Sequence, residues 1–158
     1  EVGKALPGKR YHHKDTAQIF AACHLPYVFT ASEGYPEDLM RKVAKAQWYA
    51  KNEGLVYGKI LSYCPLNWRT ADDACQPVLQ AAVDSCFFPI YEVEHGHTTL
   101  TYDPEATGRR IPVTGWLKLM GKTRHLLSPG NAPVAQGIQD EVDRRWARIR
   151  AMHDHPLL

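Results

Sequence analysis

Ile60-Leu61-Ser62-Tyr63-Cys64-Pro65-Leu66-Asn67-Trp68 is a stretch in which an apolar run ends abruptly in a turn. The apolar part predicts a buried strand, and Pro65 predicts that the strand has ended by that point. Open α/β sheets hold their ligands at the carboxyl ends of parallel strands, so the position of Cys64 favours a binding site. A buried structural cysteine beside a turn is the alternative, and an isolated Cys-Pro pair would favour it.

Helices and strands are predicted to alternate upstream of this stretch. We expect a helix at 14–24, a strand at 27–31, a helix at 36–52 and a strand at 56–62. Pro36 suits a first helical turn, and Gly54 follows the end of that helix. Alternation of this kind indicates βαβ units in a mainly parallel sheet, which is an α/β fold.

The predicted helix at 36–52 is amphipathic. Its inner face is expected to consist of Leu39, Met40, Val43, Ala46 and Ala50. The solvent-exposed face of this helix is expected to carry two i,i+4 ion pairs, Glu37–Arg41 and Asp38–Lys42.

The second half of the chain predicts a hairpin between helices. The expected elements are a helix at 70–86, strands at 89–93 and 98–102 with a turn at 94–97, a short helix at 114–120 and an amphipathic helix at 134–152. Thr70 and Asp73 suggest a capping box, although Pro77 allows the helix to begin later. Two parallel strands are too few for a parallel sheet covered on both faces, so we expect the sheet to lack its first half.

Composition sets broad limits on the class of protein. A chain of 158 residues fits one domain, and a formal net charge of +2 gives no indication of a polyanionic partner. No apolar run is long enough to span a membrane, and the first ten residues do not resemble a signal peptide. A cytoplasmic location is therefore expected.

The four cysteines, Cys23, Cys64, Cys75 and Cys86, do not predict a disulfide framework, because they are widely spread and contain no Cys-x-x-Cys pair. Cys75 and Cys86 are expected to be core thiols on one face of the same helix. A complete iron–sulfur or zinc site within this chain is not expected. If Cys64 binds a metal cluster, the other ligands must come from another segment or chain.

Histidine pairs and an arginine-rich helix suggest two further kinds of site. The pairs His12-His13, His95/His97 and His153/His155 have no nearby cysteine or carboxylate at a familiar zinc spacing, so we interpret them as surface residues. The final helix carries Arg144, Arg145, Arg148 and Arg150, and Asp140 and Glu141 are expected to pair with the first two. Without a nucleic-acid-binding motif, a solvated or subunit-contacting face is the preferred interpretation.

The stretch at 60–68, together with 81–92 and 116–126, resembles the thiamine-diphosphate-binding (beta) subunit of the 2-oxoacid:ferredoxin oxidoreductases, such as pyruvate:ferredoxin oxidoreductase. The resemblance covers about 3–126 and implies only the C-terminal half of that subunit. Residues 1–126 are accordingly expected to form the C-terminal half of a thiamine-diphosphate-binding domain. Residues 127–158 are expected to form a C-terminal helical extension.

The resemblance implies that Cys64 is one ligand of a [4Fe–4S] cluster. The other three ligands, and the motif for Mg²⁺ and thiamine diphosphate, would lie in the N-terminal part of the subunit. Pro65 and Trp68 would shield one side of the cluster. The family pattern has proline before the cysteine and glycine before the tryptophan, whereas this sequence has Tyr63 and Asn67 there, which leaves the acceptor and substrate open. No catalytic residue is assigned to this chain.

The implied function is oxidative decarboxylation of a 2-oxoacid to an acyl-coenzyme A. Pyruvate is the expected substrate, with aromatic 2-oxoacids such as phenylglyoxylate or indolepyruvate as possibilities. The implied partners are other subunits or the N-terminal half of the enzyme, coenzyme A, and ferredoxin or another electron acceptor. The alternative is a structural assembly module of such a complex, without a redox role.

Overall fold

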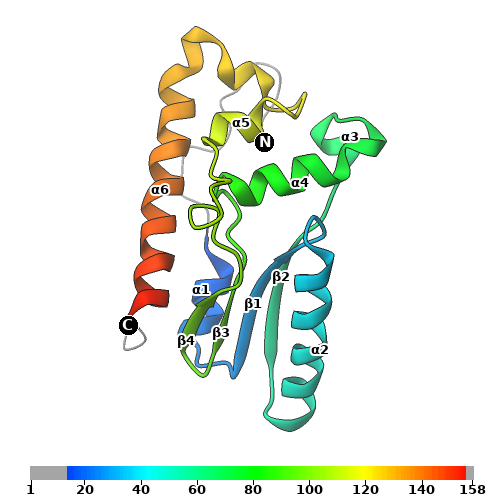
Figure 1. Ribbon diagram of the computed structural model, residues 1–158, viewed down its shortest axis with the longest axis vertical. Coiled ribbons are helices and arrows are strands. Elements are labelled where there is room, and N and C mark those ends of the chain that lie inside the picture. The colour runs from blue at the N-terminus through cyan, green and yellow to red at the C-terminus, as the bar shows by residue number, and fades with distance from the viewer. Residues whose placement is uncertain (1–13, 156–158) are drawn as a thin grey trace.

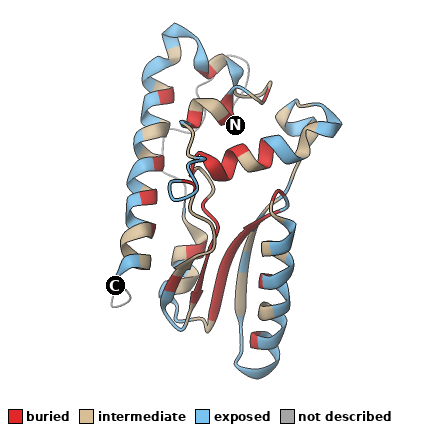
Figure 2. Ribbon diagram, in the orientation of Figure 1, coloured by how far each residue is buried: buried red, intermediate tan, exposed pale blue. Residues whose placement is uncertain are grey.

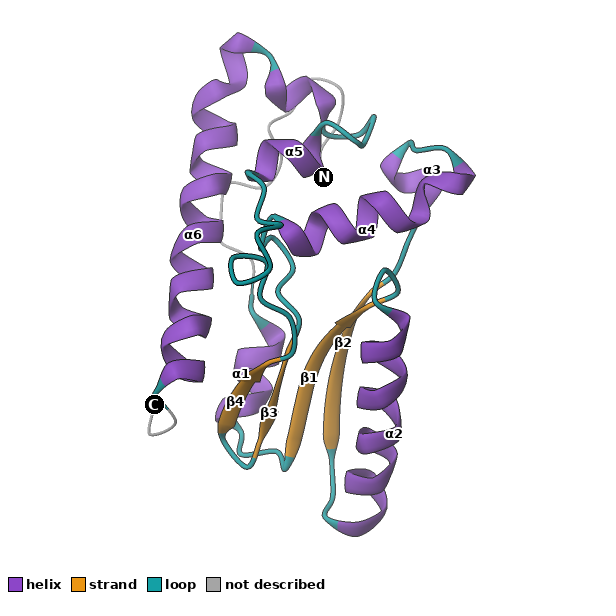
Figure 3. Ribbon diagram, viewed as in Figure 1, coloured by secondary structure: helices purple, strands orange, loops and turns teal. Residues whose placement is uncertain are grey.

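A computed structural model describes residues 14–155, in which helices flank a four-stranded sheet (Figures 1 and 3). The elements are α1 (Thr16–Ala22), β1 (Tyr27–Ser32), α2 (Pro36–Asn52), β2 (Val56–Leu61), α3 (Pro65–Trp68), η1 (Asp72–Ala74), α4 (Cys75–Asp84), β3 (Tyr91–Glu94), β4 (His97–Leu100), α5 (Val113–Leu117), η2 (Arg124–Leu127), η3 (Pro129–Asn131) and α6 (Ala132–Asp154). None of the described helices is both long and apolar enough to cross a membrane.

The sheet has the strand order β2-β1-β3-β4. β1 and β2 are parallel and joined through α2, with Tyr27 opposite Val56 and Ser32 opposite Leu61. β3 pairs antiparallel with β1 on its other side, and β4 completes the hairpin. The predicted α/β class is confirmed, and within the described residues the sheet is mixed.

Helices cover both faces of the sheet because the central strand β1 is apolar on both sides. All six residues of β1 are buried. On one face, Val28 packs with Ala17 of α1 and Ile149 of α6. On the other face, Tyr27 and Phe29 pack with Tyr49 of α2. Figure 1 shows α2 on the side of the sheet away from α1 and α6.

A second apolar cluster lies beyond the carboxyl ends of β1 and β2. It joins α4, α5 and α6 and is centred on Val78, Val113, Trp116, Val142 and Trp146. Figure 2 shows that the buried residues of α4 lie in its C-terminal part, next to the loops above the sheet. The loop that carries Cys64 therefore lies between the sheet and a helical layer.

The predicted hairpin and final helix are confirmed. His95 and Gly96 form the hairpin turn, with φ angles of 48° and 84°. A two-residue turn with both φ angles positive matches the twist of the paired strands. Gly96 adopts that conformation at no steric cost.

The helix predicted at 70–86 needs correction at both ends. It begins at Cys75, with no side-chain capping bond, so the capping box at Thr70 is wrong. It ends at Asp84, and Cys86 follows with a φ angle of 57°. The predicted common helical face for Cys75 and Cys86 is therefore wrong as well.

The predicted inner face of α2 is only partly correct. Met40 is 64% exposed and Val43 is 38% exposed, whereas Lys42 is fully buried. Lys42 and Asp38 do form the predicted pair, with 2.7 Å between Nζ and Oδ2, but it is buried rather than solvated. Arg41 pairs with Asp38 instead of Glu37.

The interpretation of residues 60–64 as the end of a buried strand is also wrong. β2 is an edge strand in the described part of the chain, and Ile60 is 46% exposed. Leu66, just after Cys64, is 90% exposed. The apolar sequence predicted burial that residues 14–155 do not provide.

Candidate functional site

Cys64 lies where the sequence places it, just beyond the carboxyl end of β2. It is the residue before α3 and has extended backbone angles, with Pro65 in the first position of the helix. Since β1 and β2 are parallel, their carboxyl ends meet at this edge of the sheet. The side chain is exposed, so the alternative of a buried structural cysteine is wrong.

Glu33 ties the two strand ends together beside Cys64. Its carboxylate accepts hydrogen bonds from the Ser62 hydroxyl at 2.8 Å and from the Tyr63 backbone N–H at 2.9 Å. The Glu33 N–H also donates to the Leu61 carbonyl. These bonds fix the direction in which the chain leaves β2, and with it the position of the thiol.

The aromatic rings of Tyr63 and Trp68, which flank Cys64 in the sequence, pack against each other. Trp68 meets Tyr63 edge-on, with 5.8 Å between ring centroids, and meets Trp116 of α5 edge-on at 6.4 Å. The Tyr63 hydroxyl donates to the Ala71 carbonyl and lies 2.6 Å from the Thr70 hydroxyl oxygen. These contacts pack residues 63–71 onto the helical layer, while the Cys64 side chain stays exposed.

The segment after α5 is hydrogen-bonded to residues 67–69, at the end of α3. Gly121 and Lys122 donate their backbone N–H groups to the carbonyls of Arg69 and Trp68, each at 3.2 Å. The Lys122 ammonium group donates to the Asn67 side-chain oxygen at 2.8 Å. Asn67, which replaces the glycine of the family pattern, therefore has a partner within the chain.

Substitution Gly121→Ala should weaken the contact between the segment after α5 and residues 67–69. A Cβ atom at residue 121 would lie 2.9 Å from the Arg69 carbonyl oxygen and 3.0 Å from the Arg69 Cβ, so the backbone must shift. Overpacking of this kind costs about 1–3 kcal/mol in the free energy of unfolding, measurable from urea denaturation followed by tryptophan fluorescence. Gly130→Ala is the control, since a Cβ there meets nothing within 4 Å. Equal stability of the two variants would contradict the close contact between Gly121 and Arg69.

Cys64 has no set of companion metal ligands in the part of the chain that the structure describes. No group of three or more His, Cys, Asp or Glu side chains in residues 14–155 could hold a metal ion. Cys23 follows α1, Cys75 begins α4, and Cys86 is buried beyond the end of α4.

The buried and exposed thiols should differ strongly in reactivity. Burial raises the pKa of Cys86 to about 12, and the nearby Arg110 only partly opposes this effect. The rise of about three units from the usual thiol value reduces the thiolate fraction roughly a thousandfold. In the metal-free chain, iodoacetamide should label Cys23 and Cys64 rapidly and Cys86 only after unfolding, as read by peptide mass spectrometry. Rapid labelling of Cys86 in the folded chain would contradict its burial.

The histidines occupy separate positions. His95 in the hairpin turn lies 3.2 Å from a Glu53 carboxylate oxygen, His97 begins β4, and His153 is in α6. His12 and His13 lie outside the described residues.

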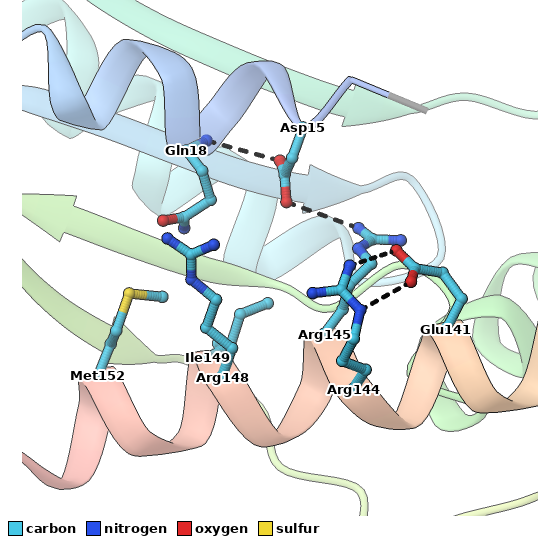
Figure 4. Close-up of a pocket in the computed structure, with 8 residues that line it drawn as sticks. All are labelled: Asp15, Gln18, Glu141, Arg144, Arg145, Arg148, Ile149 and Met152. Carbon is cyan, nitrogen blue, oxygen red and sulfur yellow. Dashed lines mark hydrogen bonds and ion pairs between the residues drawn. The ribbon is translucent and has the colours of Figure 1, made fainter. Parts of the chain in front are cut away.

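Arg144, Arg145 and Arg148 of α6 line a groove against α1 (Figure 4), whereas Arg150 donates a hydrogen bond to Glu105. Arg144 donates two hydrogen bonds to Glu141, and Arg145 lies 3.8 Å from the Asp15 carboxylate. Asp140 instead accepts a hydrogen bond from Gln136. The predicted pairs Asp140–Arg144 and Glu141–Arg145 are therefore replaced by other pairs.

Sequence reasoning missed a buried charged network between α2 and the sheet. The Lys42 ammonium group donates to the Thr30 carbonyl at 2.8 Å and to the Thr101 hydroxyl at 2.7 Å, in addition to its pair with Asp38. Burial lowers the pKa of Lys42, although Asp38 opposes this effect. The i,i+4 spacing was the available signal, but it indicates only the pair and not its depth.

No protein-family model matches the chain, but several characterised proteins do. Pyruvate synthase subunit PorB of Thermotoga maritima is 36% identical over 97% of this chain and 46% of its own length. PorB of Methanocaldococcus jannaschii is 37% identical over 79% of this chain and 40% of its own length. Ketoisovalerate oxidoreductase subunit VorB of Pyrococcus horikoshii is 30% identical over 92% of this chain and 46% of its own length.

The fold defines the class of the chain as α/β, and the compared relatives are named as subunits of oxidoreductases or of a synthase. The homologues over most of this chain are PorB and VorB subunits of 2-oxoacid:ferredoxin oxidoreductases. The chain spans less than half the length of these relatives.

Proposed function

We propose that this chain acts within a 2-oxoacid:acceptor oxidoreductase, in which a 2-oxoacid is decarboxylated oxidatively to an acyl-coenzyme A. The observation that carries the proposal is the exposed Cys64 at the meeting point of two parallel strand ends. Similarity to pyruvate synthase and ketoisovalerate oxidoreductase subunits over nearly the whole chain supports it. Residues 1–126 would belong to the thiamine-diphosphate-binding domain, and 127–158 to a helical extension.

Cys64 would hold one corner of a [4Fe–4S] cluster. The donor set fits, because such clusters take thiolate ligands and Cys64 presents one unpaired, exposed thiol on an anchored loop. A bound cluster would supply one-electron transfer. Trp68 and Tyr63 would exclude water from the side facing α5, and Glu33 would keep the thiol in place through its hydrogen bond to Tyr63.

Thiamine diphosphate and Mg²⁺ would be bound mainly by the polypeptide that supplies the remaining cluster ligands. That polypeptide would supply the carboxylate and carbonyl oxygens that Mg²⁺ prefers. This chain would contribute the end of the sheet and its subunit contacts. The partners would be that polypeptide, other subunits, coenzyme A and ferredoxin or another acceptor, in a cytoplasmic complex.

Pyruvate is the first substrate to test. It appears in the names of two of the compared relatives, and the third is named for ketoisovalerate. Aromatic 2-oxoacids such as phenylglyoxylate and indolepyruvate come next, because Tyr63 and Asn67 depart from the family pattern beside the cysteine.

The purified complex that contains this chain should reduce a viologen dye under anaerobic conditions when a 2-oxoacid and coenzyme A are supplied. Dye reduction should depend on both substrates, since acyl transfer completes the turnover. A complex that contains thiamine diphosphate and iron but reduces no dye with any 2-oxoacid would favour the alternative, a structural assembly module without a redox role.

A further inference from the structure

The groove between α1 and α6 has a volume of about 100 Å³ and is lined by more positive than negative side chains (Figure 4). Its cations are Arg144, Arg145 and Arg148, all from α6. Its carboxylates are Asp15 and Glu141, and the remaining lining residues are uncharged. The excess of positive charge makes the groove a candidate site for an anion.

The ion pairs inside the groove leave part of its hydrogen-bonding capacity unused. Arg144 is satisfied by Glu141, to which it donates two hydrogen bonds of 2.9 and 2.8 Å. Arg145 is only 15% exposed, yet its ion pair with Asp15 is long, at 3.8 Å. Its Nε atom is buried and has no hydrogen-bond partner among the described residues. Arg148 forms no hydrogen bond or ion pair with any residue of the range 14–155.

Lys59 of β2 adds to the positive charge near the groove. Burial lowers the pKa of Lys59, while Asp15 opposes this effect and Arg145 adds to it, so the ammonium group lies within electrostatic range of both. Among the described residues no carboxylate pairs with Lys59, and its ammonium group lies 5.7 Å from the centroid of the Phe88 ring. An anion in the groove would therefore be attracted by Lys59 as well as by the arginines.

The geometry of the arginines suits a phosphate group. Arg145 and Arg148 are three residues apart, so they lie on one face of α6. Figure 4 shows their side chains extending toward Asp15 and Gln18 of α1. Each guanidinium group is a planar fork of donors that matches the oxygens of a phosphate. The groove volume of about 100 Å³ corresponds to about three water molecules of the liquid, which suits a phosphate group and leaves the rest of an organic phosphate outside.

We infer that the groove between α1 and α6 binds the phosphate group of a small anionic ligand, held by Arg145 and Arg148. The phosphate oxygens would accept hydrogen bonds from the Arg148 guanidinium group and from donors that Arg145 leaves unused. A bound anion would also offset the cost of keeping the largely buried Arg145 incompletely paired. Inorganic phosphate and phosphate monoesters share this chemistry. The inference uses neither Cys64 nor the proposed redox function.

Isothermal titration calorimetry of the purified complex that contains this chain tests the inference, first with inorganic phosphate and then with phenyl phosphate as a monoester. At least one of the two probes should bind saturably, with a dissociation constant of about 1 mM or lower. Tighter binding of phenyl phosphate would identify an organic phosphate as the ligand, whereas equal or weaker binding would identify inorganic phosphate. Absence of saturable binding for both probes would overturn the inference.

Substitution Arg148→Gln should weaken phosphate binding about tenfold or more, because a charge-assisted hydrogen bond accounts for at least that factor in a binding constant. The fold should be retained, since Arg148 is exposed. Arg150→Gln is the matched control, because it removes the same charge from the same helix, whereas Arg150 pairs with Glu105 outside the groove. This control should leave the dissociation constant nearly unchanged at physiological salt, which screens distant exposed charges. Equal weakening in the two variants would indicate attraction by net charge alone and would overturn the site.

Substitution Arg148→Lys separates a forked phosphate contact from a simple positive charge. Lysine keeps the charge but lacks the planar fork, so this variant should recover only part of the affinity that Arg148→Gln loses. Full recovery would overturn the forked contact. An acidic segment of a partner protein is the alternative occupant of the groove. Binding of phosphate by the full chain alone, but not by the intact complex, would indicate that occupant and overturn the inference.

Discussion

Substitution Cys64→Ser should reduce 2-oxoacid-dependent dye reduction by more than the roughly 10- to 100-fold that loss of an outer-shell contact costs a metal site. A serine oxygen is a harder ligand than a thiolate and a poorer match to iron, so a cluster that keeps three cysteine ligands becomes labile. The fold should be unaffected, since the Cys64 side chain is exposed. The measurement is the anaerobic rate of viologen reduction at saturating substrate.

Cys75→Ser is the matched control for that experiment. Cys75 begins α4, is partly buried, and belongs to no group of metal-binding side chains in the described residues. This variant should lose little stability and retain its rate of electron transfer. Equal rates for the Cys64 and Cys75 variants would show that Cys64 has no special part in electron transfer.

Asp38→Asn should produce the largest loss of stability. It leaves the fully buried Lys42 ammonium group without its carboxylate partner, and loss of one member of a buried ion pair costs about 3–5 kcal/mol. The unfolding midpoint in urea measures the change. Arg41→Ala removes the other partner of Asp38, but Arg41 is 65% exposed, so this control should cost at most about 1 kcal/mol.

The lowered pKa of Lys42 predicts how the contribution of this residue to stability changes with pH. Because burial lowers the pKa of Lys42 in the folded chain, the unfolded chain binds more protons between that lowered value and the usual lysine value of 10.5. The contribution of Lys42 to stability therefore increases as the pH rises through this window. Asp38→Asn removes a group that raises the pKa of Lys42, so it should lower this pKa further and widen the pH window. Part of the stability lost through the substitution should therefore be recovered when the pH is raised toward 10. A loss that stays constant with pH would contradict this account.

The sequence predicted elements well where local signals decide them. Runs of β-branched, aromatic and other apolar residues, together with Pro36 and Gly54, predicted the β1–α2–β2 unit, and the spacing of Val142 and Trp146 predicted α6. The hairpin followed from the turn predicted at 94–97, which contains Gly96 and which the structure shortens to His95 and Gly96. Each of these signals acts within a few residues of the element that it specifies.

Errors arose where tertiary surroundings decide burial. Val43 and Ile60 are apolar and were expected to be covered, but the described residues leave them 38% and 46% exposed. Lys42 was expected in solvent, because a lysine gives no sign in the sequence that Thr30 and Thr101 will supply acceptors. Cys86 was placed on a helix that ends two residues earlier, at Asp84.

The candidate site was predictable in position but not in its supporting contacts. Cys64 followed from the end of an apolar strand and from the family resemblance. Glu33 and Gly121 carry no signal near residue 64 in the sequence. They reach the site only because parallel pairing and the packing of α5 bring them there.

The low-temperature paramagnetic spectrum of the reduced complex, recorded together with its iron content, tests the role of Cys64 most directly. The account predicts that Cys64→Ser removes or alters the signal of one [4Fe–4S] cluster and lowers the iron per complex, while the Cys75→Ser complex matches the parent. Full iron and an unchanged spectrum in the Cys64→Ser complex would contradict the assignment of Cys64 as a cluster ligand, and the redox role of this chain with it.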